Sequence, residues 1–279
     1  MTASSATAAR LPTYFISHGG GPWPWMKAEM GNTYAKLEAA LADMPHQIGR
    51  KPAAVLMVSA HWEAPAFTVQ AAAQPGMLYD YGGFPAHTYQ VHYRSPGAPA
   101  IAARVQALLQ AAGLPAAVDT ERGYDHGMFS PMQAIYPQAD VPVLQLSLRR
   151  GLDPAEHLAL GRALAPLRDE DVLIVGSGLS YHNLRAFGPQ AAAPSKAFDD
   201  WLGQTLASAS APRSQALVDW EQAPAARIAH PREEHLIPLM VAVGAAEGER
   251  AARIYHESDF MGGLSVSSYR FGAAAGDAA

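Results

Sequence analysis

The chain has no cysteine among its 279 residues. Disulfide bonds, thiolate metal ligands and cysteine nucleophiles are therefore excluded. Charged residues are also few, at 16% of the chain, and the formal net charge of −5 provides no excess of basic side chains for a nucleic-acid partner. Any metal must consequently be bound by His, Asp or Glu side chains, which suit iron, zinc or manganese.

Long apolar runs are missing as well. No segment approaches the ~18 consecutive apolar residues of a membrane helix, and residues 1–10 lack the apolar core of a secretory signal. These absences predict a cytoplasmic protein with no membrane partner. Because neither a linker nor an internal repeat divides the chain, we expect one domain over residues 11–272 between flexible ends at residues 1–10 and 273–279. The sequence carries no signal for an oligomeric state.

Three short apolar runs, each followed by a histidine, lie at residues 13–17, 54–58 and 172–175. Runs of this length are typical of strands that are buried on both faces of a parallel sheet. His18 and His61 come just after the first two runs, and His182 follows the third at a short distance. Because open α/β sheets collect ligands and catalytic groups at their strand ends, the pattern predicts an α/β fold with a metal site at one edge of the sheet.

Hydrophobic periodicity and turn residues predict the remaining elements. Helices are expected at residues 32–44, 100–112, 153–167, 195–206 and 233–243. Further strands are expected at residues 67–71, 87–94, 116–119, 141–147, 253–256 and 267–271. Asn32 is expected to cap the first helix, and Asp153-Pro154-Ala155-Glu156 combines an N-cap, a first-turn proline and an acid at the third helical position.

Five of the eleven histidines occupy positions that favour function, namely His18, His61, His126, His182 and His235. They lie at expected strand ends, at an expected helix start, or in glycine-rich loops, where functional side chains concentrate. Three others are expected to be ordinary solvated or core residues: His46 in a loop, His157 on an exposed helix face and His256 in a late strand.

Two familiar hydrolase motifs are absent. His230 and His235 superficially match a helical zinc-protease motif, but a spacing of five residues turns them about 140° apart on a helix, so one helical face cannot present both to a metal. Pro231 indicates instead that His230 precedes the helix and that His235 lies in its first turn. The serines of residues 176–180 do not fit G-x-S-x-G, and this glycine-rich stretch is interpreted as a flexible loop that positions His182.

Five motifs together resemble the class III extradiol ring-cleavage dioxygenases, and within them the DOPA 4,5-dioxygenase branch. In the order of that family they are S-H-G-G-G-P (17–22), S-A-H-W-E (59–63), Y-D-H-G (124–127), G-S-G-L-S-Y-H-N (176–183) and H-P-R-E-E-H (230–235). The resemblance implies a three-layer, single-domain α/β fold. Its central sheet would be mostly parallel or mixed and flanked by helices, with a metal cleft at one edge.

The resemblance also implies roles for the five histidines. His18, His61 and His235 match metal ligands, and His182 matches either an acid–base catalyst or a further ligand. His126 matches a pocket histidine that contacts substrate or assists proton transfer. Better-known members of the wider family use two histidines and a glutamate, so a shift of one residue in the alignment would make Glu234 the third ligand in place of His235.

The implied partners are a catechol substrate, DOPA-like in this branch, and O2, with Fe(II) expected for activity and a muconic semialdehyde-type product. Three neutral imidazoles leave Fe(II) its full charge, so a chelating catecholate would neutralise the site. His182 or His126 is suited to supply a proton as the ring opens, because the pKa of histidine lies near the working pH. Zn(II) can occupy the same site, which leaves two alternatives: a zinc hydrolase and a non-catalytic metal-binding relative.

Substrate specificity is left open by the sequence. Candidates for the wall of an aromatic pocket are Trp23, Trp25, Tyr79, Tyr81, Phe84, Tyr124, Phe129 and Tyr181. Candidates to pair with a substrate carboxylate are Lys27, Arg94 and Arg149. DOPA, caffeate, protocatechuate-like acids and plain catechols all remain compatible.

Overall fold

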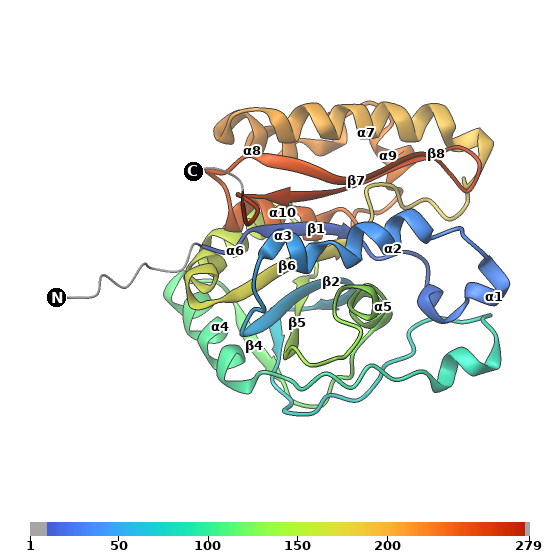
Figure 1. The fold of residues 1–279 in the computed structure, drawn as a ribbon. Coiled ribbons are helices and arrows are strands. Elements are labelled where there is room, and N and C mark those ends of the chain that lie inside the picture. Colours follow the sequence, from blue (N-terminus) through green and yellow to red (C-terminus); the bar gives the residue numbers. More distant parts are fainter. Residues whose placement is uncertain (1–9, 277–279) are drawn as a thin grey trace.

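The computed structural model describes residues 10–276 and folds as three layers around one mixed sheet (Figure 1). The predicted flexible ends lie largely outside the described residues. Within the described part, Arg10 pairs with Asp169 at 2.7 Å, and the N–H of Ala275 donates to the carbonyl of Gln47 at 2.7 Å.

Eight strands form the sheet in the order β4-β3-β5-β2-β6-β1-β8-β7. Their bounds are β1 (Thr13–Ser17), β2 (Ala54–Ala64), β3 (Phe67–Gln70), β4 (Ala116–Asp119), β5 (Val143–Arg149), β6 (Val172–Gly178), β7 (Ala251–Phe260) and β8 (Leu264–Phe271). The four central strands β5, β2, β6 and β1 are parallel to one another. Antiparallel partners flank this core, because β3 pairs with β5 and β8 pairs with β1.

The α-helices are α1 (Lys27–Met30), α2 (Ala35–Ala42), α3 (Met44–Ile48), α4 (Pro99–Ala111), α5 (His126–Ile135), α6 (Pro154–Leu164), α7 (Ala192–Ala207), α8 (Ser210–Val218), α9 (Ala226–Ala229) and α10 (Ile237–Ala245). Short 3-10 helices are η1 (Trp23–Trp25), η2 (Ala86–Gln90), η3 (Ala165–Glu170), η4 (Pro189–Ala191) and η5 (Trp220–Gln222).

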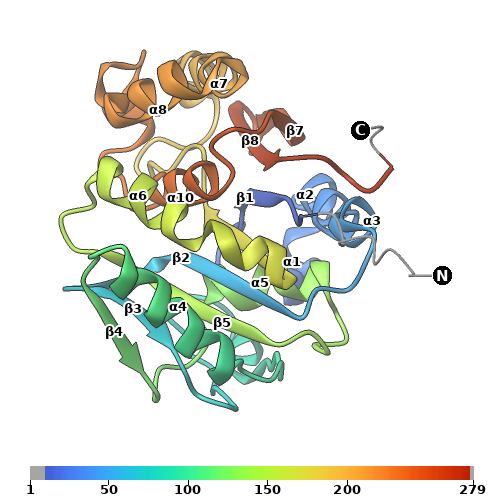
Figure 2. The ribbon, with the colours of Figure 1, turned by 90° about the vertical axis from the view of Figure 1, so that its left-hand side faces the viewer.

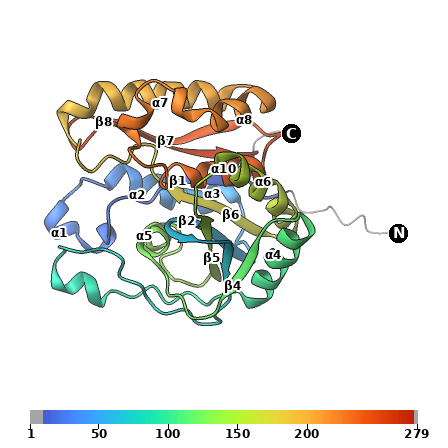
Figure 3. The same cartoon turned by 180° about the vertical axis from the view of Figure 1, so that it is seen from behind.

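Helices cover both faces of the sheet. Figure 2 shows α4, α6 and α10 on one face, with α2, α3 and α5 beyond the sheet on the other. Two consecutive residues of β1 reflect this arrangement: Thr13 Oγ1 donates to the carbonyl of Ala242 in α10 at 2.7 Å, whereas the hydroxyl of Tyr14 lies 3.4 Å from Gln47 Oε1 in α3. The long helix α7 lies along β7 and β8 (Figure 3). The expected three-layer α/β fold with a mixed sheet is therefore confirmed.

The central strands form where apolar runs predicted them. Residues 54–58 of β2 have no exposed surface, as expected for a strand between two helical layers. The predicted start of α6 is also correct, because Asp153 Oδ1 accepts a hydrogen bond from the N–H of Glu156 at 2.9 Å. A side-chain cap of this kind is typically worth about 1 kcal/mol.

Two predicted elements differ from the structure in type or continuity. Residues 87–94 were expected to be a strand but begin as η2, because Thr88 bonds to the carbonyl of Pro85 through both its N–H and its hydroxyl. The expected helix 32–44 is broken into α2 and α3, and its N-cap is Tyr34 rather than Asn32. Pro45 follows the break, and a proline there cannot continue the ladder of helical hydrogen bonds.

His157 was expected on an exposed face of its helix, but it is fully buried in α6. Its Nδ1 lies 2.7 Å from the carbonyl of Asp153, and its Nε2 accepts the N–H of Arg149 at 3.2 Å. The imidazole thereby joins the start of α6 to the end of β5. Within residues 10–276, none of the helices combines the length and the apolar character needed to cross a bilayer.

Candidate metal centre

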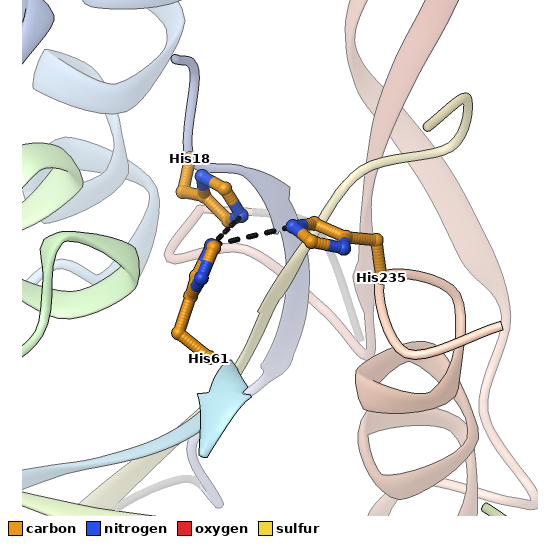
Figure 4. Close-up of side chains that lie close together, drawn as sticks. All are labelled: His18, His61 and His235. Carbon is orange, nitrogen blue, oxygen red and sulfur yellow. Dashed lines mark hydrogen bonds between the residues drawn. The ribbon is translucent and has the colours of Figure 1, made fainter. Parts of the chain in front are cut away.

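Three histidines converge beside the carboxyl end of β6 (Figure 4). His18 directly follows β1, and His61 lies in β2, which continues past it to Ala64 with a register shift against β5. His235 was expected in the first turn of a helix, but it lies in a turn that ends before α10 begins at Ile237. Pro238 is the second residue of α10, where the N–H that proline lacks would have no helical partner. This explains why the helix begins at residue 237 rather than at residue 233.

The end of β6 forms hydrogen bonds with the backbones of both His18 and His235. The N–H of His18 donates to the carbonyl of Gly178 at 3.1 Å, and the N–H of Leu179 donates to the carbonyl of His235 at 3.0 Å. A Cβ on Gly178 would lie 2.1 Å from that same carbonyl oxygen. Residues 176–180 were interpreted as a flexible loop, but residues 176–178 are the buried end of β6. Gly178 is required there by the close approach of the His235 backbone.

The Nε2 atoms of the three histidines point at one another (Figure 4). His61 Nε2 lies 3.3 Å from His18 Nε2 and 3.3 Å from His235 Nε2, and the ligand atoms of all three residues lie within 4.8 Å of one another. Two nitrogens bound at ~2.0–2.1 Å to one tetrahedral ion would lie about 3.3 Å apart. The observed spacing matches that of a shared metal ion.

The opposite ring nitrogens show which tautomer is present. Nδ1 lies 2.8 Å from the carbonyl of Gly19 in His18, 3.3 Å from Asp80 Oδ2 in His61, and 2.8 Å from Glu234 Oε1 in His235. The partners of His18 and His235 only accept hydrogen bonds, so in these two rings Nδ1 carries the proton and Nε2 presents a lone pair. The nearby carboxylate of Asp80 favours the same tautomer in His61. Three lone pairs that converge in a buried space repel one another, and a bound cation would remove that repulsion. The residues present therefore fit a metal ion.

Burial keeps these imidazoles neutral. His18 and His235 are 1% and 4% exposed, and burial lowers the pKa of both well below the usual value. Burial and the neighbouring His126 lower the pKa of His61 to about 4. A neutral imidazole is the form that binds a metal, so all three are ready to bind near pH 7.

His126 and His182 flank this group on two sides. The ring of His126 lies 3.9 Å from that of His61, and the ring of His182 stacks on that of His235 at 3.4 Å. His126 was expected in a loop but is the first residue of α5. His182 forms a separate cluster with Glu234 and His235, outside the set of three converging nitrogens.

Two carboxylates connect the flanking histidines to the converging ones. Asp80 Oδ1 accepts a hydrogen bond from Nδ1 of His126 (2.8 Å), and its Oδ2 lies 3.3 Å from Nδ1 of His61. Glu234 Oε1 lies 2.8 Å from Nδ1 of His235 and 3.0 Å from Nδ1 of His182. Burial alone would raise the pKa of each carboxyl group. The hydrogen bonds from His182 and His235 instead hold the pKa of Glu234 well below its usual range, and that from His126 lowers the pKa of Asp80.

The sequence did not predict that these two acids lie beside the histidines. Glu234 was considered as an alternative ligand, but its Oε1 lies behind His235, on the side away from the converging nitrogens. Asp80 was missed, and its only signal is an acid between Tyr79 and Tyr81 in a loop otherwise rich in glycine and aromatic residues.

A cavity of about 380 Å³ opens at the histidines. All five candidate histidines line it, together with Tyr81, Phe84 and Tyr181 from the predicted aromatic set. None of the three cations proposed to bind a substrate carboxylate is among its described lining residues. Lys27 pairs with Glu38, and Arg149 pairs with Glu156.

Known proteins resemble the chain over nearly its whole length. The family described as the catalytic LigB subunit of aromatic ring-opening dioxygenase matches residues 12–272. A "4,5-DOPA dioxygenase extradiol" of Beta vulgaris is 40% identical, covering 93% of this chain and 96% of that protein. "Dioxygenase tasH" of Hapsidospora irregularis is 36% identical, covering 96% and 88%. The crystal structure of an uncharacterized Escherichia coli K12 protein aligns with a TM-score of 0.75 and 29% identity, covering 94% of this chain and 100% of that one.

Proposed function

The chain belongs to the LigB family and is an extradiol ring-cleavage dioxygenase, and on this premise we propose that it opens the ring of a catechol with O2 at a non-haem metal held by His18, His61 and His235. The observation that carries the proposal is the convergence of three Nε2 lone pairs at the end of an aromatic-walled cavity. Both atoms of O2 would enter the product, so catechol would give a hydroxymuconic semialdehyde that keeps every carbon and hydrogen atom of the substrate.

Fe(II) is the metal proposed for activity. When bound, it would supply the positive charge that stabilises a catecholate and the redox chemistry that activates O2. Zn(II) would occupy the same three imidazoles, since sites of this kind generally bind Zn(II) more tightly than Fe(II).

His126 and His182 are proposed to move the protons. Each has its Nδ1 bound to a carboxylate, Asp80 or Glu234, so Nε2 remains to accept a proton from a catechol hydroxyl or to return one to the opening ring. The carboxylate behind each ring would stabilise the imidazolium formed by that transfer. His182 as a fourth ligand is the alternative assignment, and its place outside the group of three converging histidines favours the proton-transfer role.

The test is anaerobic reconstitution with Fe(II), followed by measurement of O2 uptake and of a yellow ring-opened product with a panel of catechols. One O2 consumed for each yellow product formed would support the proposal. No uptake with any catechol by the fully loaded enzyme, together with ester hydrolysis by the Zn(II) form, would overturn it in favour of a hydrolase.

A further inference from the structure

We propose that the catechol carries an uncharged, apolar substituent, rather than the carboxylate or amino-acid side chain of a DOPA-like substrate. The inference rests on the proposed function and specifies the substrate class of the same site. It comes from the chemistry of the cavity wall beyond the histidines.

The wall consists mainly of apolar and aromatic side chains, including Met30, Leu37, Phe84, Phe187, Leu264 and Val266. Among the described residues that line the cavity, none is lysine, arginine, aspartate or glutamate. A carboxylate that enters such a space loses its hydration without gaining a cation, which opposes binding strongly. An alkyl or aryl substituent, in contrast, gains by leaving water.

Three of the four tyrosines of the wall use their O–H donors within the protein. The hydroxyls of Tyr81, Tyr181 and Tyr255 donate to Thr88, Ala186 and Glu257, respectively. The Tyr34 hydroxyl accepts the N–H of Gly20 at 3.0 Å, which leaves its own O–H as the one donor of the four without a protein acceptor among these contacts. A single neutral hydroxyl does not replace a cation, so the tyrosines contribute mainly their ring surfaces to the cavity.

The mouth of the cavity is apolar as well. Large hydrophobic side chains are rarely exposed on this protein: Val118, Leu184, Ile228 and Met261 are the four in the described chain. Two of them, Leu184 at 74% and Met261 at 40% exposure, line this cavity. Exposed apolar surface beside a pocket commonly marks a binding site, and an apolar substituent would cover it.

The charged side chains nearest the histidine end of the cavity are carboxylates, which would repel an acidic substrate. Asp80 and Glu234 lie directly behind His126 and His182. Arg185 follows Leu184 at the mouth of the cavity and is exposed, but it is not among the lining residues. Arg185 is therefore the residue to control for.

The experiment compares two substrates of similar size, 4-butylcatechol and 3-(3,4-dihydroxyphenyl)propanoate, and adds DOPA as a third. With the Fe(II)-loaded full chain, kcat/KM from O2 uptake should favour 4-butylcatechol over either acid by at least about 10-fold, the scale on which pockets discriminate such groups. Calorimetry with the redox-inert Zn(II) form should give the same order of Kd. Leu184→Lys should raise kcat/KM for the propanoate, whereas the neutral Leu184→Gln should not.

The two ideas fail in different ways. If kcat/KM for DOPA or the propanoate equals or exceeds that for 4-butylcatechol, and does not change in Arg185→Gln, the apolar-substrate inference is wrong while ring cleavage still stands. If acid turnover is equal but falls in Arg185→Gln, the rim arginine binds the carboxylate and the inference is also wrong. Tighter binding of 4-butylcatechol without O2 uptake would instead support the apolar pocket and count against the proposed function.

Discussion

Oε1 of Glu234 accepts a hydrogen bond from Nδ1 of His235 at 2.8 Å, which directs the other ring nitrogen of His235 toward His61. The same oxygen lies 3.0 Å from Nδ1 of His182. One carboxylate thus orients both a proposed ligand and a proposed proton-transfer residue. Partners of this kind fix the tautomer and the direction of a metal-binding imidazole.

Glu234→Gln should therefore weaken metal binding by about 10–100-fold, because a neutral amide holds the protonated Nδ1 less strongly. Equilibrium dialysis with Zn(II) would measure the change in Kd. The matched control is Glu233→Gln, whose carboxylate pairs with Arg227 at 2.6 Å away from the imidazoles. A Kd for Glu234→Gln within twofold of that of the control would contradict the orienting role.

Asp80 has the corresponding place on the other side of the centre. Its Oδ1 accepts both Nδ1–H and the backbone N–H of His126, at 2.8 and 2.9 Å. Asp80→Asn should lower kcat per bound Fe(II) by about 10–100-fold, because His126 loses its orientation and the stabilisation of its protonated form. Asp140→Asn, at an exposed pair with Lys51, serves as control. An unchanged kcat at full metal content would show that Asp80 does not support His126 in proton transfer.

Alanine substitutions should separate metal binding from proton transfer. Replacement of any of the three converging histidines should remove most of the bound metal, measured as metal per chain by mass spectrometry after reconstitution. Replacement of His126 or His182 should leave most of the metal in place and lower kcat by about 10²–10⁴-fold. His46→Ala, at an 89% exposed side chain, should change neither quantity. Metal loss in His182→Ala would make His182 a ligand.

The parts of the site that follow strands could be predicted from sequence. A run such as residues 54–58 is apolar because both of its faces are buried, and this signal is local to the chain. Once the strands are placed, His18 and His61 are expected at the same end of the sheet. The first turn of α6 was likewise predictable, because Asp153 and Glu156 satisfy its cap within four residues.

The parts that depend on distant contacts could not be predicted. Asp80 reaches His126 because its loop is tied to residue 124: the N–H of Leu78 donates to the carbonyl of Tyr124, and the N–H of Tyr124 donates to that of Gly76. Composition indicates a loop at residues 76–86 but does not say what lies beside it. Helix α5 was missed because Gly127 and Pro131 are poor helix formers, and tertiary packing outweighs that preference.

Buried His157 should make stability depend on pH. Both ring nitrogens have fixed roles, because Nδ1–H donates to Asp153 and Nε2 accepts from Arg149, so only the neutral ring satisfies both contacts. Burial, the larger cause, lowers its pKa from 6.5 to about 4. Between those values the unfolded chain binds a proton that the native chain does not. His157 therefore lowers the free energy of unfolding as the pH falls from 6.5 toward 4.

Urea denaturation at pH 7 and pH 5 would measure this contribution. In His157→Gln the side chain cannot titrate, but its amide can still donate and accept a hydrogen bond. From pH 7 to pH 5 the free energy of unfolding should therefore fall by about 2 kcal/mol less in this variant than in the wild type. The comparison between variants matters because other buried histidines, such as His230, whose pKa burial lowers to about 3, titrate in both proteins. His46→Gln, on the surface, should follow the wild type. Parallel pH dependence in wild type and His157→Gln would mean that the unfolded and native chains protonate His157 alike, despite the two contacts that only the neutral ring can make.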